Sequence, residues 1–586
     1  MDCSMLLYLF EYVLQIFFPI AFFAASDIAQ VAVPTVGPQS TLYVTNEVIA
    51  PDGFPRSASL INGVFPAPLI SAQKGDNFKL NVANFLSDST MLRSTSIHWH
   101  GILQRGTNWA DGPVGVSQCP ISPNRSFLYE FNTTEAGTFW YHSHYGTQYC
   151  DGMRGALVVY DPDDPHKTLY DVDDETTVLT LGDWYHYPSP SLEKLPKPDS
   201  TLINGKGRFP VDKGRLLDDK LTDLSIVNVE YGRRYRMRIV SIACDSSYTF
   251  SIDRHNLTVI EADGESVVPV RGIDTLEIFP GQRYSVVLVA NQPVDNYWIR
   301  SLPPVEESDP LGTYERGLNS AILRYKGAKY LEPNTTPTQN NFLLETQLHA
   351  LTDPRAPGKP IMDGGDVNLH FNLSYDKEKE LFAINGTSFK PPKVPVLLQI
   401  LTGTPPEQLL PKGSIYKLPR NKSISISVLP GVFDGPHPFH LHGHSFSVVR
   451  SANSSTYNYY NPVRRDTVSL GYPSPEAQAN PILDPDPYPE KGSNVTIRFR
   501  TDNPGPWIFH CHIDWHLEIG MAIVFVEDRK DIPDVVRPPE QWQYLCPIFD
   551  NLPANMTSIS TVSIGPTSST VSIGPTSSTV SVVPTH

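Results

Sequence analysis

Histidines two residues apart are the most informative chemical feature of this chain. Ten of its 17 histidines are the members of four His-x-His pairs together with His437 and His516. The four pairs are His98/His100, His142/His144, His440/His442 and His510/His512. Residues i and i+2 of a β-strand point to the same face, so each pair presents two imidazoles to one side. Eight imidazoles can together hold a polynuclear metal cluster.

A cysteine lies inside the last pair. Cys511 stands between two histidines, so strand alternation directs its thiol to the opposite face. One thiolate, two histidines and a weak axial thioether form the ligand set of blue-copper sites. His437, His516 and Met521 complete that set. The sequence therefore predicts two metal centres, and zinc is disfavoured because it takes only about four ligands.

The pairs belong to four longer segments. These are HWHGILQRGTNWADGPVGVSQCPI (98–121), GTFWYHSHYGTQYCDGMRGALVVYD (137–161), HPFHLHGHSF (437–446) and GPWIFHCHIDWHLEIGMA (505–522). They resemble the four copper signatures of multicopper oxidases, in the wording of fungal laccases. The likeness extends over residues 37–550. One His-x-His pair would be a weak signal, whereas four signatures in order, with the right ligand types, are highly specific.

The resemblance implies four copper ions at two centres. The type 1 copper takes His437, Cys511 and His516, with Met521 at the axial position. The trinuclear centre takes His98 and His440 on the type 2 copper, with His100, His142 and His512 on one type 3 copper and His144, His442 and His510 on the other. His444 has no ligand role in the family and is predicted to lie behind the ligands.

Four aspartates are candidates for supporting roles. Asp111 matches the acid beside the trinuclear site of laccases and is a candidate for proton delivery, although Asp-Gly-Pro is also strong turn chemistry. Asp466 is the other candidate for proton delivery, but it follows two arginines, which favours a structural ion-pair partner. Asp514 could orient a ligand histidine. Asp245 matches the carboxylate that holds the phenol hydroxyl near the type 1 copper, where it could accept the phenol proton; an Asx turn is the alternative.

Two positions depart from the fungal laccase pattern. Met521 stands where these enzymes usually carry Leu or Phe, and Ile519 replaces a common Ala. The resemblance therefore does not imply a high reduction potential, and a repacked type 1 pocket is expected. Electrons are expected to enter through an exposed His516 and to pass to Cys511.

The activity implied is that of a secreted laccase, which oxidises phenols and aromatic amines with dioxygen. A ferroxidase of the same fold is the first alternative, because Glu518 lies near His516 and carboxylates there could bind Fe(II). Ascorbate oxidase and a copper-storage or adhesion protein with an inactive centre are less well matched. Lignin turnover, pigment synthesis and detoxification all use laccase chemistry.

The elements that must position these ligands read as short strands. Alternating runs such as SFLYEF, RYSVVLVA, VTIRF and MAIVFVE are bounded by Gly, Pro and Asn, as in β-sandwiches or barrels. The resemblance implies an all-β fold of three cupredoxin-like Greek-key domains. We place them at residues 26–162, 163–335 and 336–550. The copper signatures fall in the first and third, so the trinuclear site is expected at their interface.

The chain's ends and charge indicate export. Residues 1–25 contain an apolar run that ends in Ala24-Ala25, which predicts a signal peptide, although Glu11 interrupts the run and an uncleaved anchor is the alternative. Residues 551–586 contain a repeated TVSIGPTSS and predict a disordered, O-glycosylated tail. The net charge of −16 argues against nucleic acid or an anionic membrane as partner, and we expect a monomer.

Sequons and cysteines fit a secreted glycoprotein. Ten Asn-x-Ser/Thr sequons occur, at Asn124, Asn132, Asn256, Asn334, Asn372, Asn385, Asn421, Asn453, Asn494 and Asn555. Apart from Cys3 in the leader and Cys511, four cysteines remain, and three pairings of them are possible. The resemblance selects Cys119–Cys546 and Cys150–Cys244.

Overall fold

A computed structural model describes residues 34–560 except 193, 212–214, 217–221, 306–308, 310, 430–434 and 472–493. The predicted signal peptide and most of the predicted tail lie outside the described residues. Six sheets of four to seven strands dominate this part of the chain, together with a two-stranded ribbon of β13 (Pro210–Val211) and β14 (Arg215–Leu216). No helix of the described part is long and apolar enough to span a membrane.

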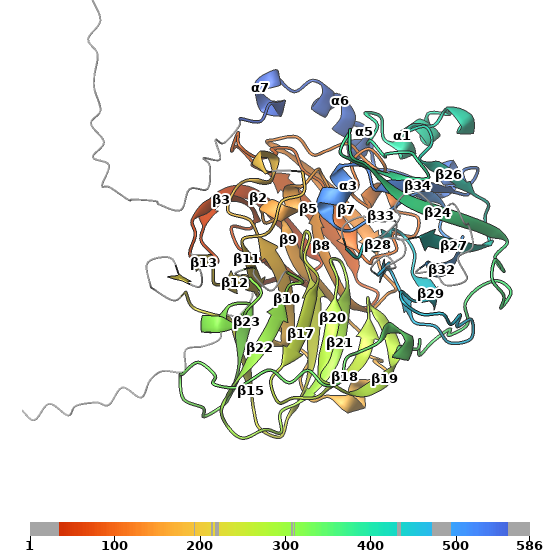
Figure 1. The fold of residues 1–586 in the computed structure, drawn as a ribbon. Helices are drawn as coiled ribbons and strands as arrows, with labels where there is room; N and C mark the ends of the chain where they lie inside the picture. Colours follow the sequence, from red (N-terminus) through yellow and green to blue (C-terminus); the bar gives the residue numbers. More distant parts are fainter. Residues whose placement is uncertain are drawn as a thin grey trace, which may run out of the picture.

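The first pair of sheets uses strands from residues 35–160 (Figure 1). One sheet has the order β1 (Thr35–Val36), β4 (Ala67–Gln73), β9 (Arg154–Tyr160), β8 (Gly137–Ser143), β6 (Ile97–His100). The other has the order β3 (Arg56–Ile61), β2 (Gln39–Ile49), β5 (Asn77–Asn84), β7 (Arg125–Asn132). In β5 the burial alternates along NFKLNV, as expected for a strand with one face in the core.

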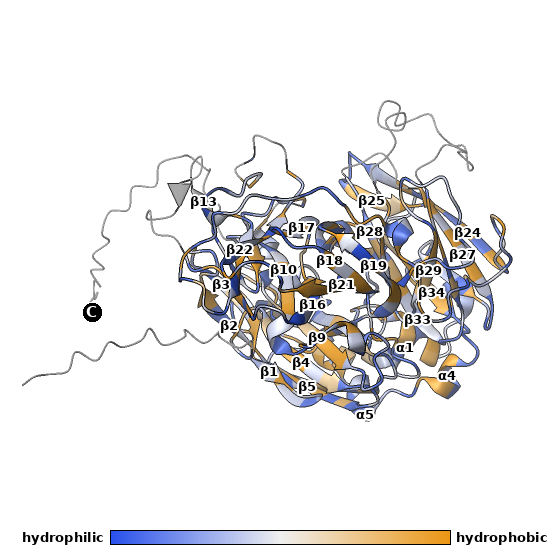
Figure 2. Cartoon of the chain, turned by 90° about the horizontal axis from the view of Figure 1, so that it is seen from below, coloured by the Kyte–Doolittle hydropathy of each residue, from blue (hydrophilic) through white to orange (hydrophobic). Residues whose placement is uncertain are grey.

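The second pair uses strands from residues 178–325. Its larger sheet has the order β12 (Lys206–Gly207), β11 (Ser200–Ile203), β10 (Val178–Trp184), β16 (Arg234–Ser241), β21 (Arg283–Val289), β18 (Leu257–Ala262), β19 (Glu265–Ile273). The smaller has the order β15 (Ile226–Val229), β23 (Ser320–Tyr325), β22 (Asn296–Leu302), β17 (Tyr248–Ile252), β20 (Thr275–Ile278). Central strands such as β21 are hydrophobic, and many peripheral loops are hydrophilic (Figure 2).

The third pair uses strands from residues 367–527. One sheet has the order β25 (Leu381–Ile384), β24 (Val367–Asp376), β27 (Ser423–Leu429), β32 (Val495–Arg500), β29 (Phe446–Arg450), β30 (Arg464–Arg465). The other has the order β26 (Ile415–Leu418), β34 (Ala522–Glu527), β33 (Gly505–Cys511), β28 (Pro438–Leu441), β31 (Thr467–Ser469). The short helices are α1 (Val396–Leu401), α3 (Asp514–Glu518), α4 (Ile532–Val535), α5 (Glu540–Gln543), α6 (Leu545–Asp550) and α7 (Ala554–Thr557).

The all-β prediction is confirmed, and the described sheets stay open instead of closing into barrels. Each of the six sheets combines parallel with antiparallel pairs. The exact domain boundaries stay a prediction. The buried core is shared between the sheet pairs, since one apolar cluster contains Trp140, Val259 and Phe509 and another contains Trp99 and Ile508. The units are therefore packed on one another through apolar contacts.

The start of the predicted tail differs from expectation. Residues 551–560 include α7 and lie against the first sheet pair instead of being disordered. The Arg93 guanidinium donates to the carbonyls of Asn555 and Ser558 at 2.6 and 2.7 Å, and Ser560 N–H donates to the Ser89 carbonyl. The buried arginine thus binds two carbonyls of a segment that composition alone assigns to a flexible stalk.

Both disulfides implied by the resemblance are formed, Cys119–Cys546 and Cys150–Cys244. The first spans 427 residues of sequence and ties α6 to the first sheet pair. Replacing both of its cysteines by serine should lower the free energy of unfolding by about 2–5 kcal/mol, because the unfolded chain gains freedom. Denaturant unfolding followed by circular dichroism measures this loss. An unchanged midpoint would show that this disulfide contributes nothing to stability.

Candidate metal centre

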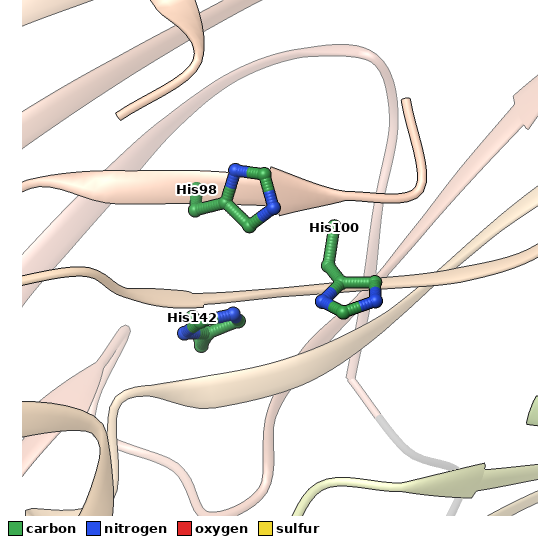
Figure 3. Close-up of side chains that lie close together, drawn as sticks. All are labelled: His98, His100 and His142. Carbon is green, nitrogen blue, oxygen red and sulfur yellow. The ribbon is translucent and has the colours of Figure 1, made fainter. Parts of the chain in front are cut away.

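Adjacent strands bring the histidine pairs face to face. His98 on β6 is directly opposite His142 on β8, and His440 on β28 is opposite His510 on β33. Figure 3 shows the rings of His98 and His100 on one strand and that of His142 on its neighbour. The partner histidines of the other three pairs lie just past the strand ends. Antiparallel pairing therefore sets the spacing of the imidazoles.

Eight histidines from the first and third sheet pairs gather in one buried cluster. Within each of three groups, all ligand nitrogens lie within 4.8 Å of one another. The groups are His98/His100/His142, His98/His440/His442 and His144/His442/His510. The eighth, His512, has its Nε2 3.2 Å from Nδ1 of His100. Gly281 of the second sheet pair borders the cluster, where a Cβ would lie 2.9 Å from the His512 ring.

The imidazole nitrogens are arranged for a metal. Nδ1 of His98, His142 and His440 is satisfied by the backbone carbonyls of Asp111, Ser143 and Asp466. Among the described residues, the following buried nitrogens have no hydrogen-bond partner: Nε2 of His98, His142, His144 and His440 and Nδ1 of His512. Buried polar atoms without partners are rare and need an explanation, which a bound metal provides. The donor set fits copper.

Burial also sets the protonation state of these ligands. Desolvation lowers the pKa of His142, His144, His442, His510 and His512 well below the ordinary value, and neighbouring imidazoles lower it further. The rings are therefore neutral at neutral pH, which is the form that binds metals.

A second group lies on the other face of β33. The ligand atoms of His437, Cys511 and His516 all lie within 4.8 Å of one another, and all three residues are buried. Sγ of Cys511 is 3.6 Å from Nδ1 of His516 and 3.9 Å from Nδ1 of His437. Burial raises the pKa of the Cys511 thiol. Cys511 directly follows a histidine of the eight-histidine cluster and precedes another, so the backbone links the two centres.

Met521 lies next to this group. It is fully buried, and its carbonyl accepts a hydrogen bond from the Cys511 N–H at 3.1 Å. Its own N–H donates to the His516 carbonyl at 3.0 Å. Phe382 covers the His516 ring at a centroid distance of 4.6 Å, and Ile519 is buried in the same apolar cluster.

Family comparisons agree with this geometry. Sequence patterns described as multicopper oxidase match residues 43–164, 175–328, and 389–477 with 488–531. The chain is 52% identical to Laccase-1 of Fomitopsis schrenkii over 527 residues, which cover 89% of this chain and 92% of that protein. It is 51% identical to Laccase-2 of Pleurotus ostreatus, over 89% and 94% of the two chains. This chain belongs to the multicopper oxidase family.

Solved structures show the same fold. A laccase from Botrytis aclada is 29% identical, with a TM-score of 0.72 over 89% of this chain and 92% of that one. Fet3p, a multicopper oxidase that functions in iron import, is 26% identical, with a TM-score of 0.72 over 90% and 98%. The three sheet pairs are thus the cupredoxin-like units of a multicopper oxidase, and the chain binds copper.

Two aspartates contact the eight-histidine cluster. Asp111 is fully buried, and its carboxylate lies 2.9 Å from Nδ1 of His442. The turn alternative also holds in part, because Gly112 has φ +106° and a Cβ there would meet the Ile97 carbonyl at 2.1 Å. The Asp111 carboxylate therefore contacts the His442 ring from within a turn.

Asp466 pairs with an arginine that the sequence did not suggest. Its partner is Arg283 of β21, at 2.7 and 2.8 Å, and not one of the two arginines that precede it. Its carboxylate also lies 3.1 Å from Nε2 of His100. Burial alone would raise the pKa of Asp466, but Arg283 and His100 lower it well below the usual range. Asp466 thus joins the second and third units beside a ligand histidine.

Asp514 and His444 are both buried near the clustered histidines. Asp514 was expected to orient a histidine of the cluster, but its partner is a different residue. The Asp514 carboxylate is 3.4 Å from Sγ of Cys150, and it has no contact with a ligand histidine among the described residues. Burial raises its pKa, which favours a neutral carboxyl against the disulfide. His444 places Nε2 2.9 Å from the buried carboxylate of Glu527.

A cavity of about 460 Å³ adjoins the Cys511 group. Asp245 and His516 both line it, together with Trp515 and Phe279. The expectation of an exposed His516 is wrong, because only 4% of the residue is accessible. Phe382 packs against the ring, and His516 lines the cavity.

The site also depends on residues that sequence reasoning missed. Arg283 and Asp183 are fully buried charged residues on strands of the second unit. Asp183 accepts hydrogen bonds from the loop that carries Asp245. Their only sequence signal is a charged residue within or at the start of an otherwise apolar strand, which predicts a buried partner but not which one.

Replacing Cys511 by serine should abolish the blue absorbance and phenol oxidation while the eight-histidine cluster still binds copper. The hydroxyl cannot provide the thiolate bond of a blue-copper site. Copper analysis and visible absorbance of the purified variant measure both effects. A variant that stayed blue would contradict the assignment of Cys511.

Proposed function

We propose that this multicopper oxidase is a laccase. It removes one electron from each phenol or aromatic amine and uses four such electrons to reduce one dioxygen molecule to water. The observation that carries the proposal is the cavity shared by Asp245 and His516 beside Cys511. Bound copper would store the electrons and reduce dioxygen. Identities of 51–52% to fungal laccases over most of the chain support the same activity.

Four copper ions are proposed, one of type 1, one of type 2 and two of type 3. His437, Cys511, His516 and Met521 would hold the first. His98 and His440 would hold the type 2 copper. His100, His142 and His512 would hold one type 3 copper, and His144, His442 and His510 would hold the other. The close spacing of His144, His442 and His510 supports one of these sets, and the unpartnered nitrogens support a metal cluster as a whole.

The cavity suits an aromatic donor. Phe279, Leu311 and Trp515 contribute apolar walls, and Asp245 contributes a carboxylate that can accept a hydrogen bond. A phenol that binds there would place its hydroxyl toward Asp245, which accepts the proton as the electron leaves toward His516. Asp111 would hold His442 in position on the dioxygen side, where it remains the candidate for proton delivery.

The enzyme is proposed to act outside the cell as a monomer on small molecules. Two disulfides support an oxidising compartment. Nine of the ten sequon asparagines are exposed, and Asn494 is partly buried, so glycans could be accommodated. The leader predicted at residues 1–25 would direct secretion.

A ferroxidase is the competing function, because Fet3p shares the fold. Its identity of 26% is half that to the fungal laccases. Initial rates on 2,6-dimethoxyphenol, ferrous iron and ascorbate, measured on one purified sample, test the proposal. A laccase should favour the phenol in kcat/KM, whereas the highest value on ferrous iron would establish the alternative.

Replacing Asp245 by asparagine should raise the KM for phenols about tenfold, because a hydrogen bond to a charged acceptor is lost. The pH optimum for phenols should also shift, since the proton acceptor is gone. Steady-state rates across pH measure both effects, with a donor that releases no proton as the control. Equal losses for both donors would assign Asp245 a structural role only.

Replacing Met521 by leucine should raise the type 1 reduction potential by roughly 60 mV, equivalent to a tenfold shift toward Cu(I). A thioether donor, even a distant one, stabilises Cu(II), and leucine removes it. Redox titration of the blue band measures the potential. If the potential were unchanged or lower at full copper occupancy, Met521 would only fill space in the core.

A further inference from the structure

One buried carboxylate holds the turn that carries Asp245. Asp183, in β10, is fully buried and accepts hydrogen bonds from three consecutive backbone N–H groups. Cys244 N donates at 2.9 Å, Asp245 N at 2.8 Å and Ser246 N at 3.2 Å. Three successive donors that converge on one carboxylate fix the backbone direction of this turn.

An arginine from the first unit neutralises this carboxylate. Arg154, in β9, is fully buried and places Nη1 3.0 Å from the Asp183 carboxylate. The same guanidinium donates to the carbonyls of Ile242, at 2.6 Å, and of Asp183 itself. Burying two charges costs free energy that this geometry must offset, and apolar residues would often be equally stable. The ion pair is therefore better explained by its role in positioning the turn that carries Asp245 than by a gain in stability.

Asp183 is also connected, through Tyr185, to a second residue that lines the cavity. The Tyr185 hydroxyl lies 3.4 Å from the Asp183 carboxylate and accepts a hydrogen bond from the Trp515 indole at 3.1 Å. Trp515 and Asp245 both line the cavity that contains His516. The Asp183 carboxylate is thus linked both to Asp245 and to Trp515 of the proposed donor pocket.

We propose that Asp183 is a positioning residue for the phenol donor. It sets the direction in which Asp245 presents its carboxylate, and through Tyr185 it fixes Trp515. The inference rests on the proposed role of Asp245 as hydrogen-bond acceptor. Asp183 itself is covered by the loop and does not line the cavity among the described residues.

The first test is Asp183→Glu, which keeps the charge beside Arg154 but moves the carboxylate by one methylene. The KM for 2,6-dimethoxyphenol should rise about tenfold, because the hydrogen bond between phenol and Asp245 is misaligned. The pH optimum of this variant for phenol oxidation should shift in the same direction as that of Asp245→Asn. Ferrocenemethanol, a neutral donor that loses no proton on oxidation, should keep its KM.

A matched control is available in the same unit. Asp253 and Arg300 form another buried ion pair, at 2.7 and 2.8 Å, and neither lines the cavity. Asp253→Glu should lower the unfolding midpoint without changing the KM for the phenol. Equal KM changes in the control and in Asp183→Glu, or equal changes for both donors, would overturn the proposal.

A double variant separates this inference from the proposed function. If Asp183 acts through Asp245, then Asp183→Glu should add little to the KM of Asp245→Asn, because the two effects are coupled. An unchanged KM in Asp245→Asn alone would defeat the role of Asp245. A raised KM there, with a normal KM in Asp183→Glu, would defeat only the present inference.

Folding is checked by the blue absorbance and the unfolding midpoint of each variant. Asp183→Asn is the second variant, because it keeps the side-chain size and one carbonyl acceptor. It should accumulate as blue protein with a raised KM for the phenol only. Failure of both Asp183 variants to fold, where Asp253→Glu folds, would assign Asp183 to stability and overturn the proposal.

Discussion

The whole molecule depends on gathering eight imidazoles in one buried cluster. Each ring needs a partner for both nitrogens, and at His98, His142 and His440 a backbone carbonyl occupies Nδ1. Nε2 is then directed inward with no protein partner among the described residues. Such a cluster is costly unless a metal fills it, so the surrounding sheets must hold the rings rigidly.

That rigidity comes from contacts between the units as much as from each sandwich. Arg283 of the second unit reaches Asp466 of the third, beside His100 of the first. Arg465 likewise pairs with Asp263 at 2.9 Å. The apolar clusters also continue from one sheet pair into the next. A site built between units is therefore as firmly supported as one within a single core.

The cavity beside the Cys511 group is also built between units. The cavity at His516 is walled by residues of the second and third units, and its acidic group stands on a loop. A loop positions a side chain less well than a strand does, and here Asp183 and the Cys150–Cys244 disulfide hold it. This support requires burying the charges of Arg154 in β9 and Asp183 in β10 as an ion pair.

The sequence by itself determined the all-β class, the His-x-His pairs and the set of metal-binding residue types. These follow from local rules: strand alternation places i and i+2 on one face, and imidazole with thiolate selects copper. The cysteine pairing came from resemblance, since arithmetic allowed three connectivities.

Only the tertiary structure decided which distant groups meet. In the folded chain, Asp466 pairs with Arg283 instead of the arginines that precede it. Asp514 contacts the Cys150–Cys244 disulfide, and Phe382 packs against the His516 ring. Arg93 binds two carbonyls of residues 551–560, although their composition predicted disorder. The physical reason is that buried charges and ring contacts are satisfied through space, between residues up to several hundred positions apart, and no local pattern records the partner.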